Sequence, residues 1–79
     1  MPTRRNPQPA WVLTHRTQLG HRIAAIRTQA GLSQDQLAER AGLDRRSIQR
    51  YEAAVRDPQY GDLLLIAAAL DTPLADLVR

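Results

Sequence analysis

A short segment of the chain concentrates side chains that can bind nucleic acid. Arg45, Arg46 and Arg50 each carry a planar guanidinium, which can donate two hydrogen bonds to a guanine edge or to a phosphate. Gln49 lies among them and can pair with adenine in a similar way. If residues 45–54 form a helix with its apolar face turned inward, these four side chains stay exposed and fit the major groove of DNA. The alternative interpretation is an ordinary solvated helix face.

The sequence contains little that would support metal binding or catalysis. His15 and His21 are six residues apart, a spacing that does not place them on one face of a helix, and no Glu-x-x-His pattern accompanies them. No serine has a recognisable histidine–acid frame, and there is no glycine-rich phosphate loop. We therefore expect no bound metal, no cofactor and no enzymatic activity.

The composition restricts the class of protein. The 79 residues have room for one domain, and the absence of cysteine excludes disulfides and thiolate metal sites. All eleven basic residues are arginine, which a GC-rich coding sequence explains, so their positions carry more information than their number. No apolar run is long enough to span a membrane, and Met1–Ala10 lacks the apolar core of a secretory signal. These features favour a soluble, cytoplasmic protein.

Five helices are expected to position the arginines, and no segment shows the period of a strand. Leu19, Ile23 and Ile26 recur at helical spacing, which predicts a first helix from about residue 17 to Ala30, before Gly31. The other helices are expected at residues 34–41, 45–54, 60–70 and 74–78. Residues 1–16, with three prolines and a Trp-Val-Leu cluster, are expected to form a flexible basic arm, and residues 17–79 an all-α domain.

The helices at 34–41 and 45–54 are expected to meet through a tight turn. Gly42 can supply the positive φ that such a turn requires, and Ala38 is small enough for the helices to cross closely. The residues expected to cap the two helices are Ser33 with Gln36, and Asp44. The residues expected to anchor the crossing are Leu37, Leu43 and Ile48.

Four blocks in register resemble the family of lambda repressor, Cro and the xenobiotic-response-element (XRE-type) regulators. The blocks are GLSQDQLAERAGL (31–43), SIQRYE (47–52), Asp-Pro (57–58) and LLLIAAAL (63–70). The resemblance covers about three quarters of the chain. It implies a five-helix lambda-repressor-like domain in which residues 34–41 brace the DNA backbone and residues 45–54 form the recognition helix.

The resemblance also assigns individual residues to DNA. Arg45, Arg46 and Arg50 stand where family members place base-reading side chains, and Gln49 lies beside them. Gln34 matches the family's glutamine that contacts phosphate or a flanking base. Further contacts to the DNA backbone are expected from Ser47, Arg40 and Arg56.

An ion pair between Arg27 and Glu52 is also predicted. Arg27 lies at the edge of the first helix's apolar stripe, and Glu52 follows the inward-facing Tyr51. The resemblance sharpens this prediction, because family members often pair an arginine with a glutamate at these positions. The pair would tie the recognition helix to the rest of the domain.

The chain departs from the family at three positions. Glycine is common at the position of Ala54, and alanine is strained at positive φ, so the recognition helix is expected to end differently or to run longer. Leu65 and Ala68 replace residues that are usually polar, which adds apolar surface to the fourth helix. This surface is expected to form a homodimer contact, or to be covered by the Trp11 segment folding back as part of the core. The residues concerned are Trp11, Leu65, Ala68, Leu74 and Val78.

The predicted function is transcriptional regulation. We expect a homodimer that binds double-stranded DNA at a two-fold operator and represses by occupying a promoter, without membrane association. Two alternatives remain open: an antitoxin that controls its own promoter, and a protein-interaction module on the same fold. A toxin-masking segment outside the fold would indicate the first, whereas the second would be expected to lack the arginines at 45, 46 and 50.

Overall fold

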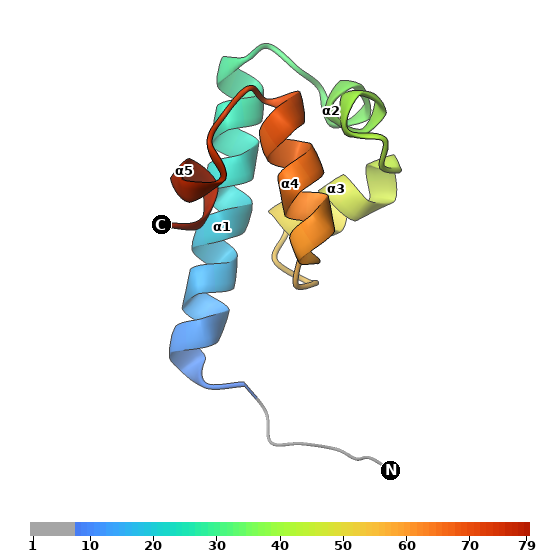
Figure 1. The fold of residues 1–79 in the computed structure, drawn as a ribbon. Helices are drawn as coiled ribbons and strands as arrows, with labels where there is room; N and C mark the ends of the chain where they lie inside the picture. Colours follow the sequence, from blue (N-terminus) through green and yellow to red (C-terminus); the bar gives the residue numbers. More distant parts are fainter. Residues whose placement is uncertain (1–7) are drawn as a thin grey trace.

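The computed structural model describes residues 8–79, and these residues form five α-helices and no strand. The helices are α1 (Ala10–Gln29), α2 (Gln34–Ala41), α3 (Arg45–Glu52), α4 (Tyr60–Ala69) and α5 (Leu74–Val78) (Figure 1). The long α1 packs against α3 and α5, and α2 packs against α3 and α4. The predicted five-helix, all-α architecture is confirmed, while residues 1–7 of the predicted arm lie outside the described residues.

The first helix begins seven residues earlier than predicted, so residues 10–16 do not belong to an arm. Pro9 precedes the helix, and its carbonyl accepts hydrogen bonds from the backbone N–H groups of Val12 and Leu13. No proline follows to interrupt the helix. The apolar period could not indicate this extension, because its large apolar side chains Trp11 and Leu13 are exposed.

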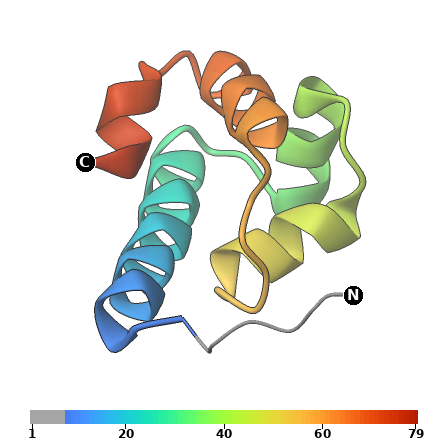
Figure 2. The ribbon, with the colours of Figure 1, turned by 60° about the horizontal axis from the view of Figure 1, so that its bottom comes forward.

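The core lies where the five helices meet. Figure 2 shows the helices arranged around a common centre, with α1 on one side and α2 and α3 on the other. Every helix contributes at least one fully buried side chain, and the largest are Ile23, Leu37, Ile48, Tyr51, Ile66 and Leu77. The pair formed by α2 and α3 therefore packs into a core shared with α1, α4 and α5 rather than standing alone.

Gly20 permits a close approach between α1 and α3. A Cβ atom at this position would lie 2.6 Å from the backbone carbonyl oxygens of both Tyr51 and Glu52. Only glycine leaves room for the last turn of α3 against the middle of α1, and this close contact fixes the position of α3. No local sequence pattern indicated this role, since the two segments are about thirty residues apart.

The ends of α2 and α3 carry the predicted caps. The Ser33 hydroxyl accepts a hydrogen bond from the Gln36 backbone N–H, and the Gln36 side chain accepts one from the Ser33 N–H. Asp44 accepts from the Ser47 N–H at 2.7 Å. Gly42 has φ +73°, the left-handed conformation that the turn was predicted to require.

Ala54 adopts the left-handed conformation that family members form with glycine, with φ 60°. The N–H of Ala54 donates to the Tyr51 carbonyl, and the N–H of Val55 donates to the Arg50 carbonyl. This is the same hydrogen-bond pattern that ends α2 at Gly42. The expectation that the alanine would change or lengthen the end of the helix is wrong, because these two hydrogen bonds and the packed core hold the strained residue in place.

Candidate nucleic-acid interface

The outer face of α3 carries the four side chains that were predicted to read bases. Arg45, Arg46, Gln49 and Arg50 are all exposed. On the opposite face Ile48 and Tyr51 are buried, as the helical period predicts. Because the inward face is fixed by packing, the four outward side chains project from a rigid support.

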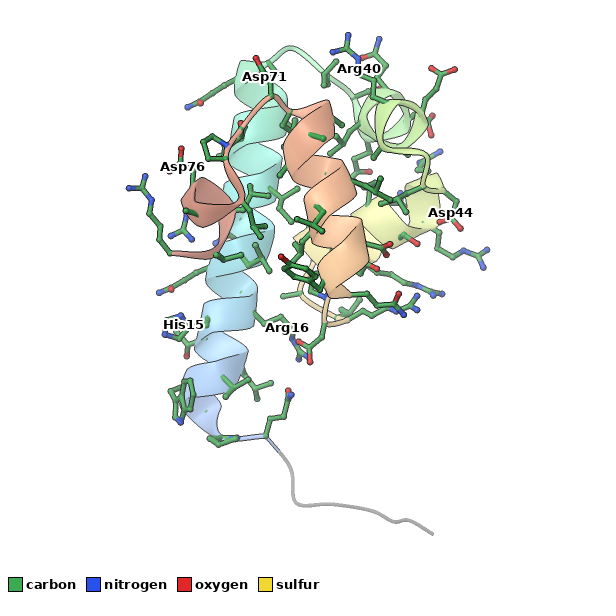
Figure 3. All side chains as sticks on the ribbon, in the orientation of Figure 1. His15, Arg16, Arg40, Asp44, Asp71 and Asp76 are labelled. Carbon is green, nitrogen blue, oxygen red and sulfur yellow. The ribbon has the colours of Figure 1, made fainter. Side chains whose placement is uncertain are left out.

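The start of α3 is stabilised by a charged cap. The Ser47 backbone N–H donates to the Asp44 carboxylate, and this hydrogen bond lowers the pKa of Asp44 below its ordinary value. Asp44 is therefore ionised at neutral pH and complements the positive end of the helix. Figure 3 shows Asp44 at the edge of the molecule where α3 begins.

The candidate backbone-contacting residues come from α2, α3 and the loop after α3. Ser47 is half-buried in the first turn of α3, and Arg56 is exposed in the loop that follows the helix. Gln34 is half-buried, and its side-chain amide donates to Glu52 Oε1 at 3.0 Å, so the side chain reaches toward the end of α3. Arg40 is exposed near the end of α2, and Figure 3 shows it at a different edge of the molecule from Asp44.

Glu52 connects α3 to two other parts of the chain. Arg27 Nε donates to Glu52 Oε2 at 2.7 Å, and Arg27 Nη2 donates to Oε1 at 3.0 Å. Arg27 Nη1 also donates to the Leu32 carbonyl at 2.8 Å, which fixes the loop between α1 and α2. Only 16% of the Arg27 side chain and 7% of the Glu52 side chain are exposed. The predicted ion pair is present, and its hydrogen bonds raise the pKa of Arg27.

Three further hydrogen bonds that the sequence did not predict hold the end of α3 and the loop after it. The Tyr51 hydroxyl donates to the Asp62 carboxylate on α4. Burial of the hydroxyl raises the pKa of Tyr51 most, and this hydrogen bond raises it further. In the loop after α3, Asp57 accepts from Arg16 Nη1 at 3.3 Å and from Gln8 Nε2 at 3.2 Å. The early start of α1 thus places Arg16 beside the loop that carries Arg56.

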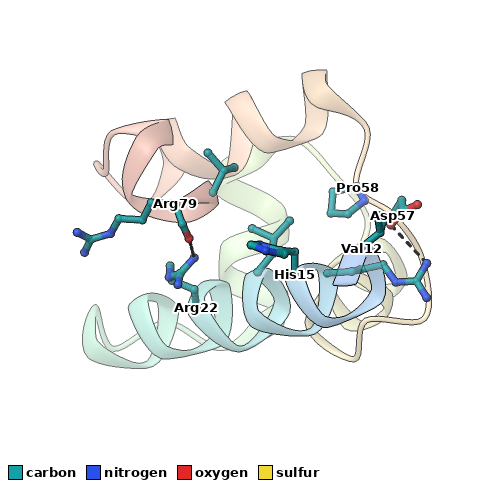
Figure 4. Close-up of a pocket in the computed structure, with 9 residues that line it drawn as sticks. Val12, His15, Arg22, Asp57, Pro58 and Arg79 are labelled. Atoms are coloured by element: carbon teal, nitrogen blue, oxygen red, sulfur yellow. Dashed lines mark hydrogen bonds and ion pairs between the residues drawn. The ribbon is translucent and has the colours of Figure 1, made fainter. Parts of the chain in front are cut away.

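A groove of about 310 Å³ lies on another face, between α1, the end of α5 and the Asp57–Pro58 loop (Figure 4). Its apolar lining comes from Val12, Leu19, Pro58 and Val78. At one side Arg22 donates to the Leu77 and Arg79 carbonyls at 3.0 and 2.7 Å and so caps the end of α5.

Trp11 does not cover Leu65, so the prediction of a lid is wrong for this chain alone. The Trp11 side chain is 66% exposed and meets the His15 ring edge-on, with ring centroids 6.1 Å apart. Leu65 is 45% exposed on α4. The reason is that Trp11 lies in the first turn of α1, where its ring meets His15 of the same helix instead of Leu65. Of the other residues expected on this surface, Ala68 and Val78 are exposed and Leu74 is half-buried.

Within residues 8–79, no group of three or more histidine, cysteine or acidic residues is arranged to hold a metal ion. None of the five described helices is both long and apolar enough to cross a membrane.

The helix-turn-helix family model matches residues 23–77. Over 53 residues, the chain is 42% identical to an uncharacterized HTH-type transcriptional regulator of Rickettsia prowazekii, an alignment that covers 67% of this chain and 41% of that protein. The chain thus spans about two fifths of the length of this curated relative.

Two solved structures share the fold. The restriction-modification controller protein C.AhdI from Aeromonas hydrophila superimposes with a TM-score of 0.79 at 34% identity, covering 81% of this chain and 97% of that one. A hypothetical transcription factor from Neisseria superimposes with a TM-score of 0.78 at 27% identity, covering 84% and 75%. With the match of the family model over most of the described helices, these similarities show that the chain belongs to the XRE-type helix-turn-helix family of transcriptional regulators.

Proposed function

We propose that this chain is a sequence-specific DNA-binding regulator that places α3 in the major groove and represses transcription by occupying a promoter. The observation that carries the proposal is the exposed face of α3. This face consists of polar side chains without a large apolar one, namely Arg45, Arg46, Gln49 and Arg50. Arginine reads the O6 and N7 atoms of guanine, and glutamine reads N6 and N7 of adenine. The similarity to a restriction-modification controller protein supports a role in gene control.

Contacts to phosphate would set the register of α3 on the duplex. The backbone N–H groups at the starts of α2 and α3 can bind phosphate, because helix N-termini carry partial positive charge. We assign supporting phosphate contacts to Gln34, Ser47 and Arg56, and a peripheral one to Arg40. Gln34 combines this role with its hydrogen bond to Glu52, which would couple a phosphate contact to the position of α3.

The regulator is proposed to act as a homodimer on a two-fold operator. A single domain of this size reads few base pairs, and two copies on half-sites about 34 Å apart double the number of contacts. Exposed Leu65 and Ala68 on α4 and Val78 on α5 offer apolar side chains for contact with the second copy, and half-buried Leu74 is a further candidate. Trp11, exposed on α1, is a further candidate contact.

Selection from random duplex DNA tests this proposal. The chain should enrich a guanine-containing half-site repeated with two-fold symmetry, and the selected DNA should bind two copies. Enrichment of no sequence at all would overturn the proposal of sequence-specific binding. Enrichment of a single half-site bound by one copy would overturn the dimer and leave base reading intact.

A further inference from the structure

Asp35 lies beside one of the arginines that are proposed to read bases. Its Oδ1 atom is 3.7 Å from Arg45 Nε, which joins the first turn of α2 to the first residue of α3. This distance is that of an ion pair and too long for a hydrogen bond. Within residues 8–79, Arg46 and Arg50 make no comparable ion pair, so Arg45 differs from the other two arginines of the face.

The negative charge of Asp35 is expected to weaken DNA binding. Its carboxylate stands at the start of α2, next to Gln34, where the backbone N–H groups are proposed to meet phosphate. A negative charge complements the helix dipole there, but it repels a phosphate that approaches the same end of the helix. The side chain is 69% exposed, so it contributes no packing that would explain its place.

The ion pair leaves the reading end of Arg45 available. A guanidinium that reads guanine in the bidentate way presents two N–H groups to O6 and N7. Asp35 engages Arg45 at Nε, the nitrogen next to the side-chain stem, so the two terminal nitrogens can point beyond the carboxylate. The Arg45 side chain is 57% exposed and otherwise free to move, and fixing it before binding reduces the entropy that base contact would cost.

We propose that Asp35 is a positioning residue that orients Arg45 toward a guanine, so that it increases specificity at one base position while it weakens binding to DNA in general. The proposal rests on the assignment of α3 as the reading helix. Asp35 itself touches no base in this arrangement, and it acts through the direction in which it holds the guanidinium.

Asp35→Asn tests the proposal because it removes the charge and keeps the size of the side chain. Affinities are measured for the selected site and for its single-base variants, with Glu39→Gln as the control that removes the same charge from an exposed position later in α2. Asp35→Asn should bind random duplex at least as tightly as the wild type. At the base pair read by Arg45, its preference for the selected base over the other bases should fall about threefold, which corresponds to the energy of an exposed ion pair. The base preferences at the other positions should not change.

Combination with Arg45→Ala separates positioning from a general charge effect. In the Arg45→Ala background, Asp35→Asn should cause no further loss of discrimination, since no side chain remains to be oriented. The proposal would be overturned if Asp35→Asn lowered the base preference equally at every position of the site. It would also be overturned if Glu39→Gln lowered the preference at the position read by Arg45 as much as Asp35→Asn does. If the wild type itself shows no base preference, the proposed function fails together with this inference, whereas a preference that Asp35→Asn leaves intact overturns the inference alone.

Discussion

Arg27 on α1 holds Glu52 on α3 through two hydrogen bonds, of 2.7 and 3.0 Å, from one guanidinium to one carboxylate. Both side chains are largely buried, and Gln34 completes the set by donating to the same carboxylate. Side chains from α1 and α2 thus converge on Glu52, the last residue of α3. The direction of α3 depends on this contact as well as on apolar packing.

The ion pair yields a test by paired substitution. Arg27→Leu should destabilise the domain by about 2–4 kcal/mol, because it strands a buried carboxylate. Arg27→Leu combined with Glu52→Leu should cost less than Arg27→Leu alone, since no unpaired charge remains. Urea unfolding of the two variants measures this, and a double variant at least as unstable as Arg27→Leu alone would contradict it.

Gly20 should be intolerant of any side chain. Gly20→Ala places a Cβ atom 2.6 Å from two backbone carbonyl oxygens, so α1 and α3 must move apart. We expect a loss of about 1–3 kcal/mol, the usual cost of overpacking. Gly61→Ala on α4 is the matched control, because a Cβ there meets nothing within 4 Å and alanine favours the helix. Equal stability of the two variants in thermal unfolding would contradict the close contact.

Ala54 offers a stabilising substitution. Since Ala54 has φ 60°, Ala54→Gly should stabilise the domain by about 1 kcal/mol. Gly42→Ala makes the reverse change at φ +73° and should destabilise it by a similar amount. Changes of opposite sign in the free energy of unfolding of the two variants would support the left-handed conformation of Ala54. A destabilised Ala54→Gly would mean that the alanine is not strained there.

These contacts show which features a single sequence can predict. The caps at Ser33 and Asp44 and the turn at Gly42 were predictable, because each depends on residues within three or four positions of one another. The Arg27–Glu52 pair spans α1 and α3, and it was predicted with the help of the family resemblance, which supplied the relation between distant positions.

The features that were missed depend on contacts or exposure that leave no local pattern. The need for glycine at Gly20 arises from the α3 carbonyls, which come close only in the folded chain. The start of α1 at Ala10 was missed because an exposed helical segment has no apolar period. Trp11 was expected either to pack on the core or to form a dimer contact, and in this chain it is exposed because it lies on that same extension.

The proposed dimer surface can be tested by adding a charge to it. Leu65→Glu should weaken dimerisation, because a carboxylate would have to be buried in an apolar contact. Gln29→Glu, which adds the same charge near the end of α1, serves as the control. Sedimentation with and without a palindromic site gives the measurement. A wild type that remains monomeric even on that site would contradict the dimer.

Guanine methylation at N7 tests whether α3 reads bases from the major groove. Methylation interference with the selected site should show that guanines with a methylated N7 are excluded from the bound fraction, because N7 faces the major groove and accepts from arginine. Replacing any one of the three arginines of α3 by alanine should abolish the interference at one guanine and reduce the preference for guanine at that position by about 1–3 kcal/mol. The three variants are Arg45→Ala, Arg46→Ala and Arg50→Ala. Arg56→Ala should weaken binding to all sequences alike and leave the interference pattern unchanged. If N7 methylation does not affect binding, or if the three arginine variants lose affinity equally for selected and random DNA, α3 does not read bases and the account is contradicted.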